Sequence, residues 1–568
     1  MGLYPNPSAW IHRESRWPLT HQNTAVQQSE TRSRHGRNRL HREHRLTIMP
    51  FETTIRRRAC PGRPVSGGIL GPRTSNTLSP PRNSAHHGER SGAQLPLIDM
   101  RSLLWFRGKE LRTRDNRLLL EGATGEMIPV FVADSRFFDR ANAAETPHRL
   151  QFLIETLSEL AEELRAKGSR LLIARGPSQE VIPDLVRRFK VDRVLAYRWT
   201  EPFGRKRDED IAAKLSVPLE LLEGETLLPP ESVRTKGGTP YAVYTPFANA
   251  ARDLMPSFAP ASGLARLPAL PKDVELGDDD MRLPTLEELG LERNPALQAG
   301  GESAARDRLD LFLMKMSRYK DARDAMALSG TSRLSADLKF GLLSVQDVWT
   351  QVEAAAPSDG RTTFLSQLLW REFAYSILWD RPEILETPFR PAFADFPWSR
   401  KGERLDWWTQ GETGYPIVDA AARQLLQEGY VHNRARMITA SFLTKHLLVH
   451  YAEGEAHYLK FLTDGDWALN NMGWQWSAGC GVDAQPYFRV FNPMSQGAKF
   501  DKSGEYVKRY LPELKGLPEK WIHSPWEAPP NVLRGAGISL GKTYPRPIVE
   551  HKEARARFLD LAKTHLKK

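Results

Sequence analysis

Cysteine is almost absent from this chain of 568 residues, which contains only Cys60 and Cys480. Two isolated cysteines exclude a disulfide framework, and they exclude a zinc or iron–sulfur site built from several thiolates. We therefore expect no metal centre. Long hydrophobic runs are missing too, since no apolar stretch reaches the roughly 18 residues that a membrane-spanning helix needs. Beyond its first 99 residues the chain has the composition of a cytoplasmic protein.

Lysine is missing from residues 1–99, which hold 15 arginines against six acidic residues and so carry a net charge of +9. The remainder has 65 basic and 63 acidic residues, a net charge of only +2. This basic leader has no apolar periodicity, and we expect it to be disordered because it cannot bury enough surface to offset the entropy of ordering. Three interpretations stay open: a true translation start at Met100, an organelle transit peptide, and a basic tail that grips DNA. Peptides from residues 1–99 of the natural protein would exclude the first.

Apolar runs alternate with helical patterns over residues 100–225. The predicted strands are S-L-L-W-F, I-P-V-F-V-A, R-L-L-I-A, R-V-L-A-Y and P-L-E-L-L. Arg149–Ala166 has helical spacing of its apolar residues and ends before Gly168. This alternation predicts an α/β domain with a doubly wound parallel sheet. No G-x-G-x-x-G motif follows the first strand, so the dinucleotide fingerprint is absent.

The rest of the chain divides into a connector and a helical part. Residues 226–300 are rich in proline, glycine and acidic residues, which predicts a surface connector, with T-P-Y-A-V-Y-T-P-F-A-N-A as an ordered anchor. Residues 301–568 have helical patterns almost throughout and contain many tryptophans. We therefore predict an all-α C-terminal domain.

The segment Asp464–Pro493 combines acids, amides and tryptophans with little aliphatic surface. On a helix, Asp466, Asn470 and Trp474 are spaced by four residues and share one face. A face with a charge, an amide and an indole suits a bound planar, polar ligand better than an apolar core. The alternative is a solvated helix followed by a turn rich in tryptophan, which is less favourable because exposed indoles are costly.

Two further motifs contain groups that bind anions. In Y-K-D-A-R-D-A-M-A-L-S-G-T-S-R-L-S, the hydroxyls and backbone N–H groups near Thr331, Ser332 and Ser335 precede an apolar helix. This pattern fits an anion site, but an ordinary N-cap formed by Thr331 or Ser332 is the more common arrangement. In V-H-N-R-A-R-M, Asn433, Arg436 and Met437 share a helical face and Arg434 points elsewhere. An arginine between apolar turns needs an anionic partner, for which Asp464 is the obvious candidate.

Trp370 and Trp476 supply two large flat side chains from separate segments. They are either core indoles or the walls of a site that grips a flipped-out base, each stack contributing roughly 1–3 kcal/mol. Four cations could contact DNA phosphates, although each is more often a surface charge. These cations are Arg323, Arg434, Arg489 and Lys499.

Six motifs, in order, resemble the DNA photolyase/cryptochrome family, and the match runs from about Arg101 to the end. They are W-F-R-G-K-E-L-R-T-R-D-N, T-S-R-L-S, L-W-R-E-F, W-T-Q-G-E-T-G-Y-P-I-V-D-A, H-N-R-A-R-M and N-N-M-G-W-Q-W with Y-F-R-V-F-N-P. The resemblance implies an antenna domain over 100–225, a connector and a helical domain that holds FAD. It is strongest to the class I cyclobutane pyrimidine dimer photolyases.

The resemblance also assigns FAD contacts residue by residue. Near the phosphates it implies Tyr319, Thr331, Ser332, Leu334 and Ser335. Around the flavin and its ribityl chain it implies Asn433, Arg436, Asp464, Asp466 and Asn470. Asn470 would face the flavin N5, where members that repair DNA typically have Asn and plant-type photoreceptors have Asp.

The implied reaction is light-dependent repair of cyclobutane pyrimidine dimers in UV-damaged DNA. Reduced FADH⁻ absorbs light and passes an electron to a flipped-out dimer, whose ring splits before the electron returns. Met437, Trp370 and Trp476 match the dimer photolyases, and H-N-R-A-R-M lacks the paired histidines of (6-4) photoproduct repair. The alternative is a cryptochrome-type photoreceptor without repair activity. We expect a cytoplasmic monomer, associated with the nucleoid if the source is bacterial.

Two positions depart from the family pattern. Gln367 stands where the family has a dimer-contacting glutamate; its amide can bind a pyrimidine edge but cannot stabilise a developing charge as a carboxyl group can. The electron-transfer chain would run from Trp474 through Tyr451 to Trp398, with a tyrosine in the middle. Because neutral tyrosine is harder to oxidise, either this hop is slow or an indole such as Trp407 or Trp467 replaces it.

A second chromophore is also implied, since R-W-T-E-P-F-G-R-K-R-D is more similar to members with a deazaflavin antenna than to folate binders. Deazaflavin, folate, FMN and an empty pocket all remain open.

Overall fold

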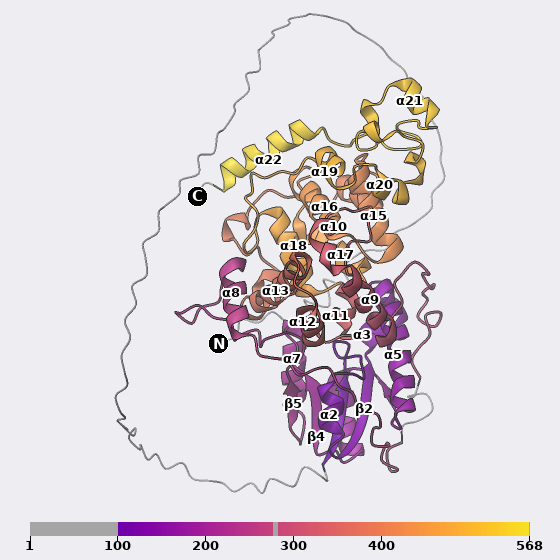
Figure 1. Cartoon of the computed structure of the whole chain (residues 1–568), viewed down its shortest axis with the longest axis vertical. Coiled ribbons are helices and arrows are strands. Elements are labelled where there is room, and N and C mark those ends of the chain that lie inside the picture. The colour runs from indigo at the N-terminus through magenta and orange to yellow at the C-terminus, as the bar shows by residue number, and fades with distance from the viewer. Residues whose placement is uncertain (1–99, 276–281, 567–568) are drawn as a thin grey trace, which may run out of the picture. The chain divides into compact units, whose positions relative to one another are not determined.

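The computed structural model describes residues 100–275 and 282–566. The basic leader of residues 1–99 lies outside the described residues, as does the segment 276–281. All described residues belong to one compact unit, in which an α/β part precedes a helical part along the chain (Figure 1). Within these ranges no helix is both long and apolar enough to cross a membrane.

The α/β part contains a five-stranded sheet whose paired strands are all parallel, in the order β3-β2-β1-β4-β5. The strands are β1 (Arg101–Phe106), β2 (Glu126–Ala133), β3 (Leu172–Arg175), β4 (Arg193–Tyr197) and β5 (Leu219–Leu222). The helices of this part are α2 (Arg117–Gly122), α3 (Ser135–Phe138), α4 (Arg140–Ala143), α5 (Pro147–Ala166), α6 (Ser178–Arg188) and α7 (Pro202–Ala212). All five strands predicted from apolar runs are present, and so is the helix predicted over Arg149–Ala166.

Helices cover both faces of this sheet because successive side chains of a strand point to opposite sides. In β1, Leu103 and Trp105 pack in a cluster with the apolar residues of α6 and α7. Leu104 and Phe106 instead join a cluster with α2 and α5 that continues into the helical part. Both faces are therefore buried, which explains why the strands read as continuous apolar runs.

The described residues of the connector contain one helix, α8 (Tyr244–Leu254), within the segment predicted to be an ordered anchor. The helical part begins at Glu302. Its longer helices are α9 (Glu302–Lys315), α12 (Val345–Ala354), α13 (Asp359–Asp380), α14 (Glu403–Gln410), α15 (Pro416–Glu428), α16 (Asn433–Lys445), α17 (Tyr451–Phe461), α18 (Trp467–Ala478), α19 (Pro493–Phe500) and α22 (His551–His565). Short helices between them are α10 (Tyr319–Ala322), α11 (Ser335–Phe340), α20 (Glu505–Tyr510) and α21 (Pro530–Gly535).

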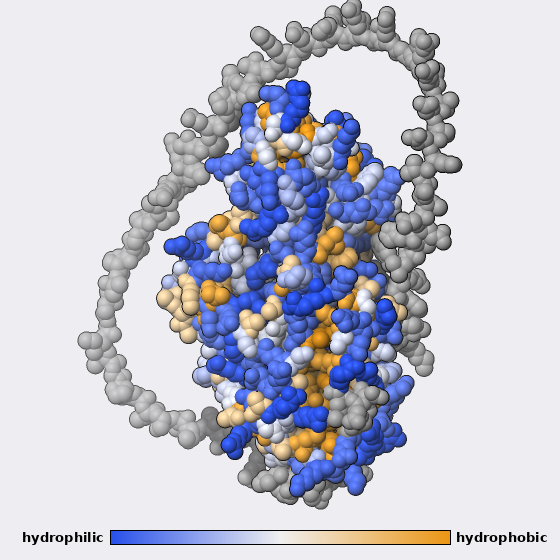
Figure 2. Space-filling view, turned by 90° about the vertical axis from the view of Figure 1, so that its right-hand side faces the viewer, coloured by the Kyte–Doolittle hydropathy of each residue, from blue (hydrophilic) through white to orange (hydrophobic). Residues whose placement is uncertain are grey.

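Buried polar side chains hold the central helix α18 in place. Gln475 donates to the carbonyl of Ile384 at 2.8 Å, and Asn471 donates to the same carbonyl at 3.1 Å and to the Glu455 carboxylate. Neither of these amides lines the large cavity described below, to which Asn470 of the same helix contributes. The helix therefore has polar residues on two sides: one side packs in the interior and the other lines the cavity. The face of the molecule drawn in Figure 2 is mostly hydrophilic with local apolar areas.

Candidate functional site

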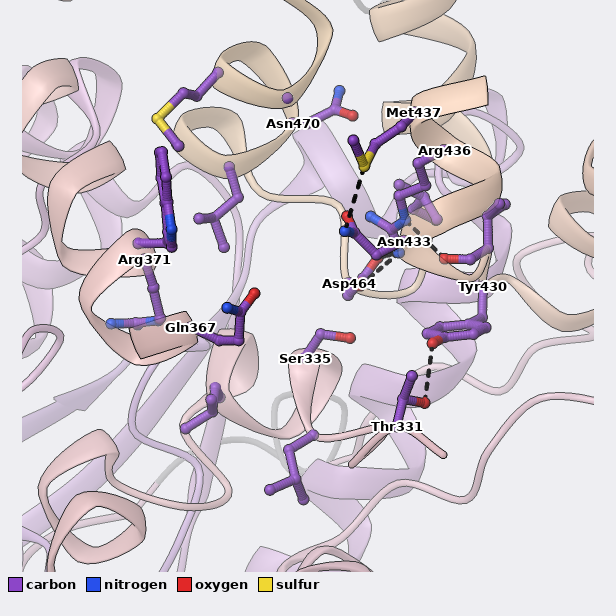
Figure 3. A pocket seen from close by; sticks show the side chains of 18 of the residues that line it. Thr331, Ser335, Gln367, Arg371, Tyr430, Asn433, Arg436, Met437, Asp464 and Asn470 are labelled. Carbon is purple, nitrogen blue, oxygen red and sulfur yellow. Dashed lines mark hydrogen bonds and ion pairs between the residues drawn. The ribbon is translucent and has the colours of Figure 1, made fainter. Parts of the chain in front are cut away.

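A cavity of about 650 Å³ lies among the helices of the C-terminal part. Its walls come from α10, α11, α13, α16 and α18 and from the turns that precede α11 and α16. Figure 3 shows Gln367 and Arg371 of α13 on one side of this space, with Asn433, Arg436 and Met437 of α16 across from them. Segments separated by more than one hundred residues thus converge on one site.

The turn before α11 brings hydroxyl groups to the cavity. It needs Gly330, because a Cβ there would lie 2.3 Å from the carbonyl oxygen of Ala322. Arg333 has a φ of +61°, a left-handed conformation that is rare for a residue with a side chain and is enriched at functional sites. Thr331, Ser332 and Ser335 all line the cavity.

The alternative that Thr331 or Ser332 is an ordinary N-cap is wrong. The helix begins at Ser335, and its N-cap residue, Leu334, makes no side-chain cap. The Ser332 hydroxyl accepts only a long 3.4 Å hydrogen bond from the Leu334 N–H, and the Thr331 hydroxyl lies 3.4 Å from that of Tyr430. The tight turn carries both hydroxyls past the helix end, which leaves them facing the cavity.

The start of α16 forms the opposite wall. His432 caps this helix through Nδ1, which accepts from the Arg434 N–H at 3.1 Å. Burial lowers the pKa of His432 to about 4, so the ring is neutral and can accept this bond. Asn433, Arg436 and Met437 line the cavity together, as their spacing predicted.

The predicted ion pair between Arg436 and Asp464 is confirmed. The Arg436 Nη2 lies 2.8 Å and 3.0 Å from the two carboxylate oxygens, and Nε donates to the Val431 carbonyl at 2.8 Å. Burial alone would lower the pKa of Arg436, but the charge and hydrogen bond of Asp464, together with Tyr430 and Tyr458, outweigh burial and raise this pKa. The pair stands at the edge of the cavity, as the dashed lines in Figure 3 show.

Arg434 also lines the cavity, so the expectation that it points elsewhere is wrong. Its Nη2 forms an ion pair with Asp324 at 2.8 Å, and its guanidinium lies 4.3 Å from the ring centre of Phe500. Asp324 follows the short helix α10 and Phe500 ends α19, so segments outside α16 hold the Arg434 side chain in place.

Asn470 lines the cavity and has a defined orientation. Its Nδ2 donates to the backbone carbonyl of Glu455 at 2.9 Å. A carbonyl cannot donate, so the nitrogen must occupy that position and the amide oxygen is left to accept a bond from the cavity. Asn470 thus offers an acceptor that is fixed before any ligand arrives.

Asp466 does not line the cavity, so the expectation that it shares a face with Asn470 and Trp474 is wrong. Its carboxylate caps α18 by accepting from the Leu469 N–H at 3.0 Å and accepts from the Tyr375 hydroxyl at 2.7 Å. Lys109 of the α/β part lies 4.0 Å away. A capping carboxylate must turn back over the first helical turn, which directs it away from the face that Asn470 occupies.

The flat side chains expected to form two walls both line the cavity: Trp370 comes from α13 and Trp476 from α18. Gln367 lies one turn before Arg371 on α13, and Figure 3 shows its amide directed into the open space. Leu334 and Tyr319 complete the set of expected cavity residues.

The aromatic residues expected to transfer electrons lie in two groups of rings in contact, one around Trp474 and one around Tyr451. Trp474 lines the cavity and contacts Tyr458 at 5.1 Å and Trp408 at 5.8 Å between ring centres. Tyr451 contacts Trp398 at 5.9 Å, as expected for the outer hop. Trp408 therefore stands beside Trp474, whereas Trp467, an indole considered from the sequence, lines a different cavity.

The four cations expected to contact DNA phosphates differ in their positions: two line the cavity and two are exposed outside it. Arg323 and Arg434 line the cavity, and Arg434 has the carboxylate partner described above. Arg489 and Lys499 are exposed, lie outside the cavity lining, and each stands over a neighbouring aromatic ring. Only the second pair is exposed as a contact with a DNA backbone requires.

Sequence reasoning missed several residues of the cavity. One of them is Tyr430, whose hydroxyl contacts that of Thr331 and whose ring centre lies 3.8 Å from the guanidinium of Arg333. Arg371 pairs with the adjacent Glu372 at 3.0 Å, and burial raises the pKa of Glu372 to about 7. The adjacent letters R-E inside an apolar helix were a signal for a buried ion pair, while Tyr430 had no such signal.

A second cavity of about 170 Å³ lies at the carboxyl ends of β1, β2 and β4. Ligands of open α/β sheets bind at this edge. The guanidinium groups of Arg107 and Arg207 lie 4.5 to 5.1 Å from the rings of Trp105 and Trp199. Burial and the nearby Arg107 lower the pKa of Arg207 to about 10. Lys339 borders both this cavity and the large one.

The comparisons with known proteins agree with this geometry. Residues 102–271 match the family described as DNA photolyase, and residues 364–564 match the FAD binding domain of DNA photolyase. A deoxyribodipyrimidine photo-lyase of Agrobacterium fabrum is 39% identical over 80% of this chain and 96% of its own.

Two solved structures are similar over most of the chain. A bacterial class III photolyase from Agrobacterium tumefaciens has a TM-score of 0.74 at 36% identity and covers 84% of this chain and all of its own. A cryptochrome from Synechocystis has a TM-score of 0.74 at 27% identity, with coverage of 82% and 99%.

Proposed function

Because this chain belongs to the DNA photolyase family, we propose that it binds FAD in the large cavity and repairs cyclobutane pyrimidine dimers in light. One observation carries the proposal: a single cavity contains residues suited to a flavin together with two indoles suited to an extruded pyrimidine dimer. The flavin side includes Asn470 and the Arg436–Asp464 pair, and the indoles are Trp370 and Trp476.

The residues of the cavity fit FAD chemically. The turn at Thr331 and Ser332, together with Ser335, offers hydroxyls and N–H groups to a diphosphate. Tyr319, Leu334 and Asn433 extend this wall. The Arg436–Asp464 ion pair and the fixed amide acceptor of Asn470 could bind a polar ring edge, and apolar side chains such as Leu338 and Leu469 also line the cavity.

Bound FAD in its reduced form supplies the electron that splits the dimer after light is absorbed. Asn470 favours that form, because its fixed amide oxygen accepts a hydrogen bond and the reduced ring has an N–H at N5 where the oxidised ring has none. Asp464 orients Arg436 and compensates its buried charge, so the guanidinium can face the ring edge. Asp466 acts indirectly in this proposal, by fixing the start of the helix that carries Asn470.

Trp370 and Trp476 would hold the flipped-out dimer, with Gln367 and Met437 between them and the flavin side. Stacking on an indole contributes roughly 1–3 kcal/mol per base and tolerates any pyrimidine. The Gln367 amide can pair with a pyrimidine edge but brings no charge or acidic proton. We therefore expect binding of the lesion to be retained and the splitting yield to be lower than in a Gln367→Glu variant.

DNA outside the cavity would be held by exposed cations, chiefly Arg489 and Lys499. These side chains lie on the loop after α18 and on α19, and the loop also exposes Phe488. Since the chain beyond residue 99 has a net charge of only +2, its grip on undamaged DNA should be weak and its affinity should come from the lesion.

Photoreduction of the flavin would start at Trp474. The expected continuation is through Tyr451 to Trp398, whose rings are in contact. Trp408 offers a second indole next to Trp474, buried and with no hydrogen-bond partner for its Nε1. Tyr451 and Trp408 are therefore the two residues to substitute in a test of the electron-transfer route.

The second cavity would hold an antenna chromophore. Two guanidinium groups between indoles suit a planar ligand with negative charge, and deazaflavin, folate and FMN all have that character. Extraction of the purified protein and an absorption spectrum distinguish the three. Recovery of FAD as the sole chromophore would contradict this part of the proposal.

The decisive experiment illuminates the reduced protein with an oligonucleotide that carries one thymine dimer. Restoration of intact thymines, followed by chromatography, is expected in light and absent in the dark. The second candidate is a cryptochrome-type photoreceptor, favoured by the neutral Gln367. No restoration in light, with the reduced flavin verified by absorption, would select that candidate.

A further inference from the structure

Tyr244 packs flat against the back of one cavity wall. Its ring lies 3.7 Å from that of Trp370 between centres, with an angle of 8° between the planes. Trp370 lines the cavity, whereas Tyr244 does not. Tyr244 is the first residue of α8 and comes from the connector, 126 positions before Trp370, so the fold brings a remote segment behind this indole.

Two polar contacts fix the position of the Tyr244 ring. Its hydroxyl donates to the carbonyl oxygen of Ser366 at 2.8 Å, one turn before Trp370 on the same helix. Its backbone N–H donates to the carboxylate of Asp483 at 3.2 Å. The ring of Phe373 contacts both Tyr244 and Trp370 at an angle, at 6.1 Å and 5.9 Å. The indole is therefore held from behind and from one side.

Asp483 connects this stack to the loop after α18. It has a φ of +43°, a strained value for a residue with a side chain, and such residues persist only where the surroundings hold them. The same loop carries Phe488 and Arg489 at the surface. The Asp483 carboxylate thus connects this loop to α8, and Tyr244 of α8 in turn contacts Trp370.

We propose that Tyr244 is a positioning residue that orders Trp370 for the extruded pyrimidine dimer, with Asp483 as its anchor on the loop. The inference rests on the proposed function, because it assumes that Trp370 contacts the lesion. A half-buried indole at a cavity rim otherwise samples several rotamers, and binding must then select one of them. The flat contact with Tyr244 selects the rotamer before binding and leaves the opposite face of the indole for a base.

The test measures Kd for an oligonucleotide with one thymine dimer in the FAD-containing protein. Tyr244→Leu removes the stack and should raise Kd roughly 2- to 12-fold, the effect of one side chain that must be ordered on binding. Tyr244→Phe keeps the stack and should stay within about twofold of the wild type. Tyr241→Leu is the matched control, since Tyr241 lies three residues earlier and its ring contacts Phe247.

The double variant Tyr244→Leu/Trp370→Ala separates positioning from general stability. If Tyr244 acts through Trp370, the double variant binds no more weakly than Trp370→Ala alone, because the effect has no indole left to act on. Asp483→Ala provides a second variant outside the core, with a smaller increase in Kd that Trp370→Ala should also abolish. The yield of repaired thymines at saturating DNA should stay unchanged in Tyr244→Leu.

An unchanged Kd in both Tyr244→Leu and Asp483→Ala would overturn the inference, and so would effects that add fully to that of Trp370→Ala. In either case a wild type that binds and repairs the dimer leaves the proposed function intact. A wild type that neither binds nor repairs the dimer overturns the proposed function and the inference with it.

Discussion

The buried ion pair beside the flavin side of the cavity gives a quantitative prediction. Asp464→Asn keeps the shape of the side chain and one acceptor, but it leaves Arg436 without its counter-charge. Side-chain exposure is only 7% for Asp464 and 26% for Arg436. Removing one partner of a fully buried pair costs about 3–5 kcal/mol, and the residual exposure of the arginine lowers this to about 2–3 kcal/mol.

The measurement is urea denaturation of the FAD-free protein, followed by circular dichroism. A matched control is Asp359→Asn, which removes the partner of Lys320 at 2.6 Å while both side chains are more than half exposed. Water replaces that lost attraction, so we expect no measurable change in the free energy of unfolding. Equal effects of the two substitutions would refute the reasoning that burial makes the Arg436–Asp464 pair important.

Four further predictions concern single residues. Tyr451→Trp should speed photoreduction of oxidised FAD, measured by flash absorption, and an unchanged or slower rate would remove Tyr451 from the route. Gly454→Ala should destabilise the protein by about 1–3 kcal/mol, because its Cβ would come 2.2 Å from the ring of Trp474. Gly473→Ala, with nothing within 4 Å, should instead stabilise the helix by up to about 1 kcal/mol; the opposite order in thermal denaturation would contradict both. Since burial lowers the pKa of His432 to about 4, the stability that its neutral ring supplies is complete above about pH 6.5 and is lost as the pH falls toward 4, by about 1.4 kcal/mol per pH unit. His432→Asn keeps a cap acceptor and should flatten that part of a urea-denaturation series, whereas an unchanged slope would exclude this histidine as the cause.

The sheet could be predicted because strands β1 to β4 are buried on both faces, whereas the edge strand β5 is partly exposed. Such strands read as short apolar runs, and the runs from Ser102–Phe106 to Pro218–Leu222 each correspond to an observed strand. The order of the strands could not be read in the same way. It depends on which helix crosses which face, and the local pattern around α5 or α6 contains no such information.

The candidate site was predictable where the spacing on one helix determines the shared face. Asn433, Arg436 and Met437 are the example, and the need of a buried guanidinium for an anion then identified Asp464. The same argument failed for Asp466, because a residue at a helix start can turn its carboxylate onto the helix's own N–H groups. Periodicity describes the interior of a helix and not its first position.

The aromatic contacts of Tyr244 and Trp408 with remote segments could not be predicted from residue spacing. Tyr244 and Trp370 are an aromatic pair whose partners lie in the connector and in α13. The position of Trp408 beside Trp474 has the same origin, since helical spacing in either segment gives no information about the other. In both cases only the packed structure decides which indole has which neighbour.

Lys339 borders both cavities, and it has a single ammonium group. Its pKa is lowered to about 8 by burial and by the nearby Arg149, so it responds strongly to any negative charge that arrives beside it. A negatively charged group bound in either cavity would interact with this one ammonium group. If both cavities bind ligands as proposed, their occupancies are coupled through Lys339, and the coupling free energy is the same in both directions.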